Sequence, residues 1–173
     1  MRNSGVINSD NLIMDGLNRD TCKPEGQTYT YNQGVILGGL VEMYRATGDS
    51  SYLDSATKIA DAVTKTGSKM QDSAGILGDD CDKNKNCVPD GNDGEQFKGV
   101  FLRNLKKLQA VRPSDQYKTF IVRNAQSIWE KDLQITNGGC FNGVMWGGPY
   151  VAADASTQSS ALDCLNAALA ATK

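Results

Sequence analysis

Three short segments of the chain carry side chains suited to ligand contact, and each stands at the start of an expected helix. The side chains are Tyr31, Asn32 and Gln33 in the first segment, Gln96 and Lys98 in the second, and Gln158 in the third. Amide and hydroxyl groups hydrogen-bond to hydroxyl-rich ligands but are neither strong acids nor strong bases. Polar residues at a helix start also serve as caps for its free N–H groups, so both roles stay open.

Acid–base chemistry in this chain would fall to carboxylates, because the sequence contains no histidine. Histidine is the commonest general base and the commonest ligand of transition metals. Asp15 is expected either to reach the same region as a hydrogen-bonding carboxylate or to stabilise the turn before Gly16. No cofactor and no metal are expected. The stretch from Asp82 resembles a calcium loop only in part, since Cys87 stands where such a loop needs glycine.

The composition indicates one ordinary globular domain over residues 1–173, with 39% hydrophobic and 22% charged residues. A net charge of −2 without a basic stripe argues against nucleic acid as a partner. No apolar run approaches the length of about 18 residues that spans a bilayer, so no membrane span is expected. The chain as given shows no export signal at its start.

Hydrophobic periodicity predicts about five helices, over residues 32–47, 51–65, 93–111, 113–132 and 156–171. The first, third and fifth are apolar on most sides, which is typical of buried helices, and the other two have one apolar face. Residues 1–31 are interpreted as a small hairpin or extended loop, and residues 67–94 and 137–153 as long polar loops. We therefore expect an all-α fold of antiparallel helical hairpins joined by long Gly/Asn-rich loops.

A shared direction of the odd-numbered helices would gather their N-termini at one end of the molecule. The candidate residues Tyr31, Gln96 and Gln158 would then converge, and both long loops would border them. Trp146, surrounded by glycines, is expected either to form an exposed stacking platform or to anchor its loop. Trp129 lies on the apolar stripe of its helix and is expected in the core. Amides beside a flat aromatic face predict a carbohydrate cleft.

The chain resembles the C-terminal half of glycoside hydrolase family 76, the bacterial and fungal α-1,6-mannanases. The resemblance rests on NLIMDGLN (11–18), TYTYNQGVILGGLVEMYRATGDSSYLDSATKIADAV (28–63), GIL (75–77), EQFKGVFLRNL (95–105) and ADASTQSSALDCLNAAL (153–169). It implies a partial (α/α)6 toroid, mannan or a related polysaccharide as the partner, and retaining hydrolysis of α-1,6-mannosyl bonds.

The catalytic pair of that family is two adjacent aspartates followed by aromatic residues, on an inner helix of the N-terminal half. This chain lacks that half. Asp79 and Asp80 are adjacent but stand in a Gly/Asn-rich loop, so the resemblance carries no catalytic role over to them. Glycoside hydrolysis needs two carboxyl groups, and the chain alone is therefore expected to be inactive. The alternative is a non-catalytic carbohydrate-binding or cell-wall interaction module.

Two further expectations concern partners and cysteines. Five helices cannot close a toroid, so we expect an exposed apolar patch that self-association or the missing half covers. Of five cysteines, Cys81 and Cys87 could close a polar loop, and Cys140 and Cys164 could tie the second long loop to the last helix. Cys22 would remain unpaired. Disulfides indicate a secreted, extracellular or cell-wall protein.

Overall fold

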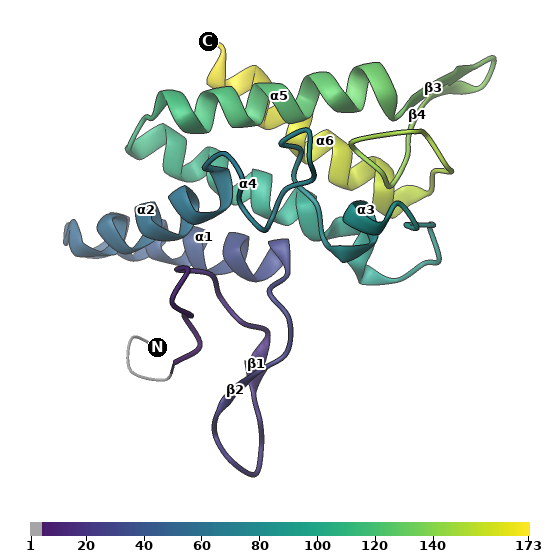
Figure 1. Ribbon diagram of the computed structural model, residues 1–173. Coiled ribbons are helices and arrows are strands. Elements are labelled where there is room, and N and C mark those ends of the chain that lie inside the picture. Colours follow the sequence, from purple (N-terminus) through teal and green to yellow (C-terminus); the bar gives the residue numbers. More distant parts are fainter. Residues whose placement is uncertain (1–4) are drawn as a thin grey trace.

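The computed structural model describes residues 5–173 and consists mainly of helices (Figure 1). The long helices are α1 (Thr30–Thr47), α2 (Ser51–Thr64), α4 (Phe97–Val111), α5 (Asp115–Lys131) and α6 (Ala155–Ala171). A short helix α3 (Asp80–Asn84) and a 3-10 turn η1 (Asp93–Gln96) lie between α2 and α4. The five predicted helices are confirmed with small changes at their ends, and α3 lies within a stretch that was expected to be all loop.

Helices α1, α4 and α6 lie side by side and run in the same direction. At their N-terminal ends the rings of Tyr31 and Phe97 lie 4.3 Å apart, and near their C-terminal ends the Lys107 ammonium lies 3.3 Å from Glu42. Helices α4 and α6 are also parallel. Gln96 and Ser156 meet at their N-terminal ends, and further along the guanidinium of Arg103 lies 3.0 Å from Asp163. The prediction of a shared direction is confirmed.

Glycines allow these three helices to approach closely. A Cβ atom on Gly34 of α1 would lie 2.6 Å from the Cα atom of Phe101 in α4. A Cβ atom on Gly99 of α4 would lie 2.7 Å from the Cα atom of Ser160 in α6. Only glycine fits at such contacts, so these positions set the spacing of the layer.

Helices α2 and α5 form a second layer that covers the first. Gly48 adopts the left-handed conformation at the end of α1, and the chain reverses there into α2. Tyr117 of α5 donates from its hydroxyl to Asp61 of α2 at 2.8 Å. The core fills the space between the layers and includes Leu37, Ile59, Phe101, Leu105, Phe120, Ile121 and Ile128.

Two small antiparallel sheets show that the all-α expectation was incomplete. Strands β1 (Gly16–Leu17) and β2 (Pro24–Glu25) form one sheet, and β3 (Leu133–Thr136) and β4 (Gly139–Asn142) form the other. An isolated bridge between Ile7 and Ile13 joins the two apolar runs for which a hairpin or an extended loop was expected, and the β1–β2 sheet follows them. Residues 1–4 of that prediction lie outside the described residues.

An apolar groove remains open on the outer side of α5 and α6. It has a volume of about 450 Å³ and is named here the α5/α6 groove; its apolar lining is Val122, Ala125, Trp129, Leu165, Ala168 and Leu169. Trp129 is 63% exposed, so the prediction that it packs in the core is wrong. The apolar stripe of α5 extends beyond the part of the helix that the other helices cover. Within residues 5–173, no helix is both long enough and apolar enough to cross a membrane.

Candidate functional site

The N-terminal ends of α1, α4 and α6 meet at one end of the molecule, which we call the rim (Figure 1). Besides the contact between Tyr31 and Phe97, Gln96 donates from Nε2 to the Ser156 hydroxyl at 3.4 Å, joining the starts of α4 and α6. Gln96 is exposed, as a ligand-contacting amide would need to be. Three helix N-termini at one place also orient free N–H groups and positive dipole ends outward.

Asp15 stands at the rim as a hydrogen-bond acceptor for two side chains of α1. The Tyr31 hydroxyl donates to its Oδ1 atom at 2.8 Å, and Asn32 donates to the same atom from Nδ2 at 3.3 Å. The hydrogen bond to Asp15 raises the pKa of Tyr31 above its ordinary value. Asp15 is exposed and its Oδ2 atom is available to a ligand hydroxyl. The structure thus brings three predicted site residues together.

Aromatic rings lie directly beside these polar groups. Tyr29, Tyr31 and Phe97 form a cluster in which the centroid distances are 6.1 Å between the tyrosines and 5.4 Å between Tyr29 and Phe97. All three side chains are partly exposed. An apolar ring next to a carboxylate and an amide is an arrangement that binds the apolar face and the hydroxyl groups of a sugar.

Gln33 is buried and holds the N-terminal segment against α1. Its side chain is fully buried, its Oε1 atom accepts from the Ile13 N–H at 2.7 Å, and its Nε2 atom donates to the Ile13 carbonyl at 2.9 Å. A third bond runs from Nε2 to the Tyr29 carbonyl. Gln33 therefore fastens the N-terminal hairpin to α1 and presents no polar atom to solvent. Asn32 has a double role, since its Oδ1 atom also accepts from the Tyr29 N–H.

Gln158 connects the rim to the second hairpin. Its Oε1 atom accepts from the Asn142 N–H at 2.9 Å, and its side chain is partly exposed. The neighbouring Thr157 caps α6 together with Asp154. Gln158 thus lies at the rim but uses its carbonyl oxygen within the protein.

Lys98 lies beneath the rim. Its side chain is only 3% exposed, so it does not lie on a solvated helix face. Its ammonium donates to Asp82 at 2.5 Å and to the Val144 carbonyl at 2.8 Å, and it lies 5.5 Å from the ring centre of Trp146. Trp146 is 1% exposed, so the exposed platform predicted for it is wrong. It anchors its loop, because its carbonyl accepts from the buried Ser127 hydroxyl.

Asp79 was not expected to have a structural role, and the structure places it against the start of α1. Its carboxylate accepts from the Thr30 N–H at 2.8 Å and from the Thr30 hydroxyl at 2.7 Å. Burial raises the pKa of Asp79, while these bonds from Thr30 oppose the rise. Asp80 begins α3 and pairs with Lys83, which corrects the expectation that the two aspartates lie on no helix.

Asp132 is a second buried carboxylate that sequence reasoning missed. It is fully buried at the end of α5, where its carboxylate has no side-chain partner within residues 5–173 and faces the backbone N–H of Met145. Burial raises its pKa to about 7; Lys98 opposes the rise and Asp82 adds to it. A carboxylate at a helix C-terminus faces the negative end of the helix dipole, which is unfavourable. The position of Asp132 at the end of a predicted helix could therefore have drawn attention to it from the sequence.

Glu95 and Asp154 lie next to each other where η1 meets the start of α6. Glu95 is 5% exposed; its Oε1 atom accepts from the N–H groups of Asp90 and Gly91, and its carboxyl group contacts that of Asp154. Burial and the neighbouring Asp154 raise the pKa of Glu95, whereas the Thr157 N–H lowers the pKa of Asp154. Glu95 is therefore the member of the pair that binds a proton more readily.

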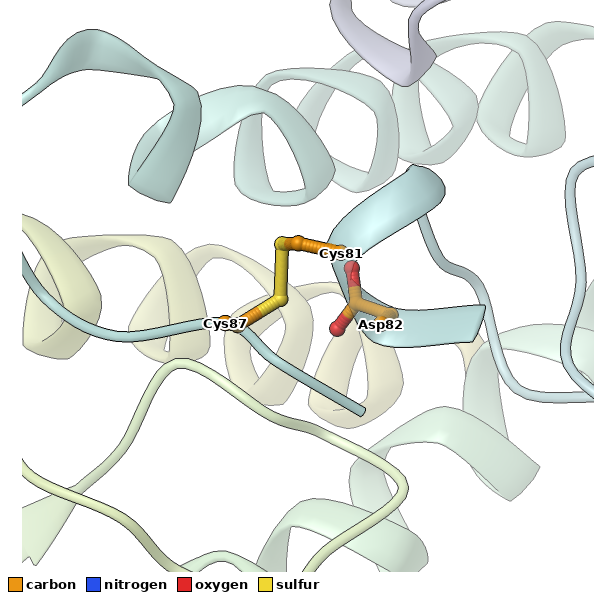
Figure 2. A group of neighbouring side chains, drawn as sticks. All are labelled: Cys81, Asp82 and Cys87. Carbon is orange, nitrogen blue, oxygen red and sulfur yellow. A yellow bond between two sulfur atoms is a disulfide. The ribbon is translucent and has the colours of Figure 1, made fainter. Parts of the chain in front are cut away.

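Cys81, Asp82 and Cys87 place their ligand atoms within 4.8 Å of one another, but Figure 2 shows the two sulfurs joined in a disulfide. Disulfide sulfurs are not thiolates, which are the form that binds metals. The Asp82 carboxylate is also engaged, because it accepts from Lys98 and from the Asp79 N–H. These three side chains therefore stabilise the loop around α3 and have no free metal ligands.

The predicted bond between Cys81 and Cys87 is confirmed, and the bond predicted between Cys140 and Cys164 is wrong. Cys140 is exposed on the β3–β4 hairpin, and Cys164 is buried in the core on α6. Cys22 is unpaired, as expected, and it is exposed.

Comparison with known proteins matches the whole chain, residues 1–173, to the model of glycosyl hydrolase family 76. The chain belongs to this family. No curated protein sequence matches it significantly.

Three solved structures illustrate the similarity. The Lin0763 protein from Listeria innocua has a TM-score of 0.76 and 26% identity, over 94% of this chain and 44% of that protein. The GH76A α-1,6-mannanase from Salegentibacter sp. HEL1_6 has a TM-score of 0.74 and 24% identity, over 92% and 46% of the two chains. An inactive variant of that mannanase, with two adjacent aspartates replaced, was solved with α-1,6-mannotetrose; its TM-score is 0.73 and its identity 25%, over the same shares of the chains. Our chain thus spans less than half the length of these structures.

Proposed function

We propose that this chain is an arc of the (α/α)6 toroid of an α-1,6-mannan-hydrolysing enzyme and carries part of its substrate cleft. Family membership and the parallel layer of α1, α4 and α6 support the arc. The observation that carries the cleft is the contact of Asp15 with Tyr31 and Asn32 beside an aromatic cluster. Asp15, Tyr31, Asn32 and Gln96 are the proposed sugar contacts.

The remaining predicted site residues are proposed to hold the cleft in shape. Gln33 fastens the N-terminal hairpin, Lys98 neutralises buried carboxylates, and Gln158 positions β4. Trp146 supports the loop above Lys98. In this proposal, these polar side chains position the sugar-contacting residues through hydrogen bonds and ion pairs and do not touch the sugar.

We also propose that the chain alone does not hydrolyse mannan. Retaining hydrolysis needs two carboxyl groups about 5 Å apart, one as acid and one as nucleophile. Asp79 accepts two hydrogen bonds from Thr30 and serves as a cap, and Asp80 pairs with Lys83 on the surface. The disulfide between Cys81 and Cys87 fits secretion to an oxidising compartment.

Isothermal titration with α-1,6-mannotetraose tests the cleft. We expect saturable binding that Asp15→Asn weakens about tenfold, roughly 1.4 kcal/mol. Asp10→Asn is the matched control, because Asp10 is another carboxylate of the N-terminal region and pairs with Lys69. Equal affinity of both variants would refute the assignment of Asp15. Release of mannose oligomers from α-1,6-mannan by the purified chain would refute the inactivity.

The α5/α6 groove supports a second candidate function, a self-associating carbohydrate-binding module. Trp129 and Leu169 are each more than 60% exposed in this groove, which favours a covering partner. Light scattering combined with the same titration separates the two functions. A stable dimer that binds the sugar supports the module, and a monomer that gains affinity only with the remainder of the toroid supports the partial enzyme.

A further inference from the structure

A pocket of about 520 Å³ lies beside the rim and shares no residue with the proposed sugar contacts. Four segments surround it: the loop after α2, helix α3, the end of α5 and the loop that follows β4. We name it the lysine pocket; its lining is Gln71, Asp72, Ser73, Ala74, Leu77, Asp82, Lys83, Lys85, Lys131, Met145, Gly147 and Gly148. Its size is within the range of about 300–1,000 Å³ that small ligands occupy.

The charge available in the lysine pocket is positive. Asp82 is already neutralised by Lys98, which lies on its other side. Asp72 accepts from the N–H groups of Ala74 and Ile76 through Oδ1, so it serves its own loop. Asp82 is thus paired with a cation, whereas Asp72 keeps its negative charge, and the three lysines of the lining outnumber it.

The lysines of the pocket have fewer partners. Lys83 pairs with the exposed Asp80 at 3.2 Å, a contact that solvent screens. Neither Lys85 nor Lys131 has an ion pair within residues 5–173. Three lysines therefore line one cavity, and within residues 5–173 they form one exposed ion pair, that of Lys83 with Asp80.

The walls that carry these lysines are fixed by covalent and packing contacts. Lys83 and Lys85 lie in the loop that the disulfide between Cys81 and Cys87 closes. Cys87 is buried in a cluster with Val144 and Met145, and Met145 itself lines the pocket. A fixed loop positions its charges at a smaller cost in conformational entropy.

The opposite wall is equally constrained. Gly148 has a positive φ of 71°, and a Cβ atom there would lie 2.7 Å from the Cβ atom of Lys131. Glycine at this position lets the loop close against the end of α5. The pocket is therefore formed by close contacts between segments that are distant in the sequence.

We propose that the lysine pocket binds a phosphorylated sugar, with the phosphate between Lys85 and Lys131. Lysine acts as a point charge toward phosphate, and the cavity is larger than phosphate alone requires. The Oε1 atom of Gln71 and the hydroxyl of the exposed Ser73 are the polar groups that the lining offers to a sugar, since the Nε2 atom of Gln71 donates to the Val63 and Lys65 carbonyls. Asp82 and Lys98 pair with each other between the pocket and the rim.

Titration calorimetry with mannose 6-phosphate, inorganic phosphate and mannose tests this proposal on the full chain. We expect mannose 6-phosphate to bind saturably, phosphate to bind more weakly, and mannose to show no binding at this pocket. Affinity for mannose 6-phosphate should fall at least about tenfold in Lys85→Gln/Lys131→Gln. It should also fall between low and high salt, because the contact is ionic.

Lys118→Gln is the matched control, since Lys118 is an exposed lysine of α5 that does not line the pocket. Ser73→Asp leaves every lysine in place and should weaken binding through its negative charge. Absence of binding, or equal affinity of the double variant and the control, would overturn the proposal. Binding of α-1,6-mannotetraose should not change in the double variant, so failure at the rim and failure at this pocket are read separately.

Discussion

At the residue scale, the side chains beneath the rim form a buried charge network around one cation. Lys98 faces Asp82 directly, and its charge also acts on Asp79 and Asp132. One cation among three carboxylates leaves an excess of negative charge if all of them ionise. Burial is costly for unpaired charge, so this network sets the stability of the rim.

Lys98→Met should destabilise the protein strongly, because it leaves Asp82 buried without its partner. We expect a loss of about 3–5 kcal/mol in the free energy of unfolding, measured by urea denaturation. Lys107→Met is the control on the same helix; its pair with Glu42 is exposed, and the expected loss is below about 1 kcal/mol. Similar losses in both variants would contradict the network.

Asp132 should make the protein less stable as the pH rises. Its pKa is about 7 in the folded chain against an ordinary 3.8, so the native state binds this proton more tightly than the unfolded state. The contribution of this group to the free energy of unfolding therefore falls between pH 3.8 and about 7, by on the order of 2–4 kcal/mol. Asp132→Asn should remove this fall and raise the melting temperature at pH 8. An unchanged difference between variant and native protein across this range would contradict the assignment.

At the element scale, the spacing of the parallel layer depends on glycines of α1 and α4. Gly34→Ala should destabilise the protein by about 1–3 kcal/mol, since the new Cβ atom meets the backbone of Phe101 at 2.6 Å. Gly39→Ala on the same helix should stabilise it by about 0.5–1 kcal/mol, because nothing lies within 4 Å of the new atom. Thermal unfolding of both variants measures the contrast. A destabilised Gly39→Ala or a neutral Gly34→Ala would show that the helices are spaced differently.

The helices were predictable because hydrophobic periodicity is a local property. The β3–β4 hairpin was also within reach, since Asn137 and Gly138 are a typical two-residue turn between alternating residues. Exposure was not predictable for the tryptophans. Trp129 follows an apolar stripe, but no element of the described chain covers that side of α5. Trp146 is flanked by glycines, yet Lys98 and Ser127 lie at distant positions in the sequence and hold it inside.

The candidate site was predictable in its polar residues and less so in their roles. Tyr31 and Asn32 begin α1, and Asp15, for which the sequence left the rim and a turn as alternatives, accepts hydrogen bonds from both. Gln33 and Lys98 look identical to surface ligands in the sequence, and only the tertiary contacts show that both are buried. Asp79 and Asp132 were missed because long-range burial gives them their roles.

At the scale of the whole molecule, the open α5/α6 groove should govern association. Trp129→Gln/Leu169→Gln should reduce concentration-dependent association in light scattering while changing the melting temperature little, since both side chains are already exposed. Val88→Gln is the control, because Val88 is exposed away from this groove. Equal association of the native chain and the double variant would show that the groove has no partner.

The central claim is that the N-termini of α1, α4 and α6 form one sugar-binding rim. Amide chemical-shift mapping with α-1,6-mannotetraose tests it most directly, because it locates the ligand without assuming which residue contacts it. We predict that the largest shifts cluster at Asp15, Tyr31, Phe97 and Ser156, at the shared N-terminal end of the layer. Shifts confined to the opposite end, at Thr47, Val111 and Ala171, or no shifts at saturating sugar, would contradict it.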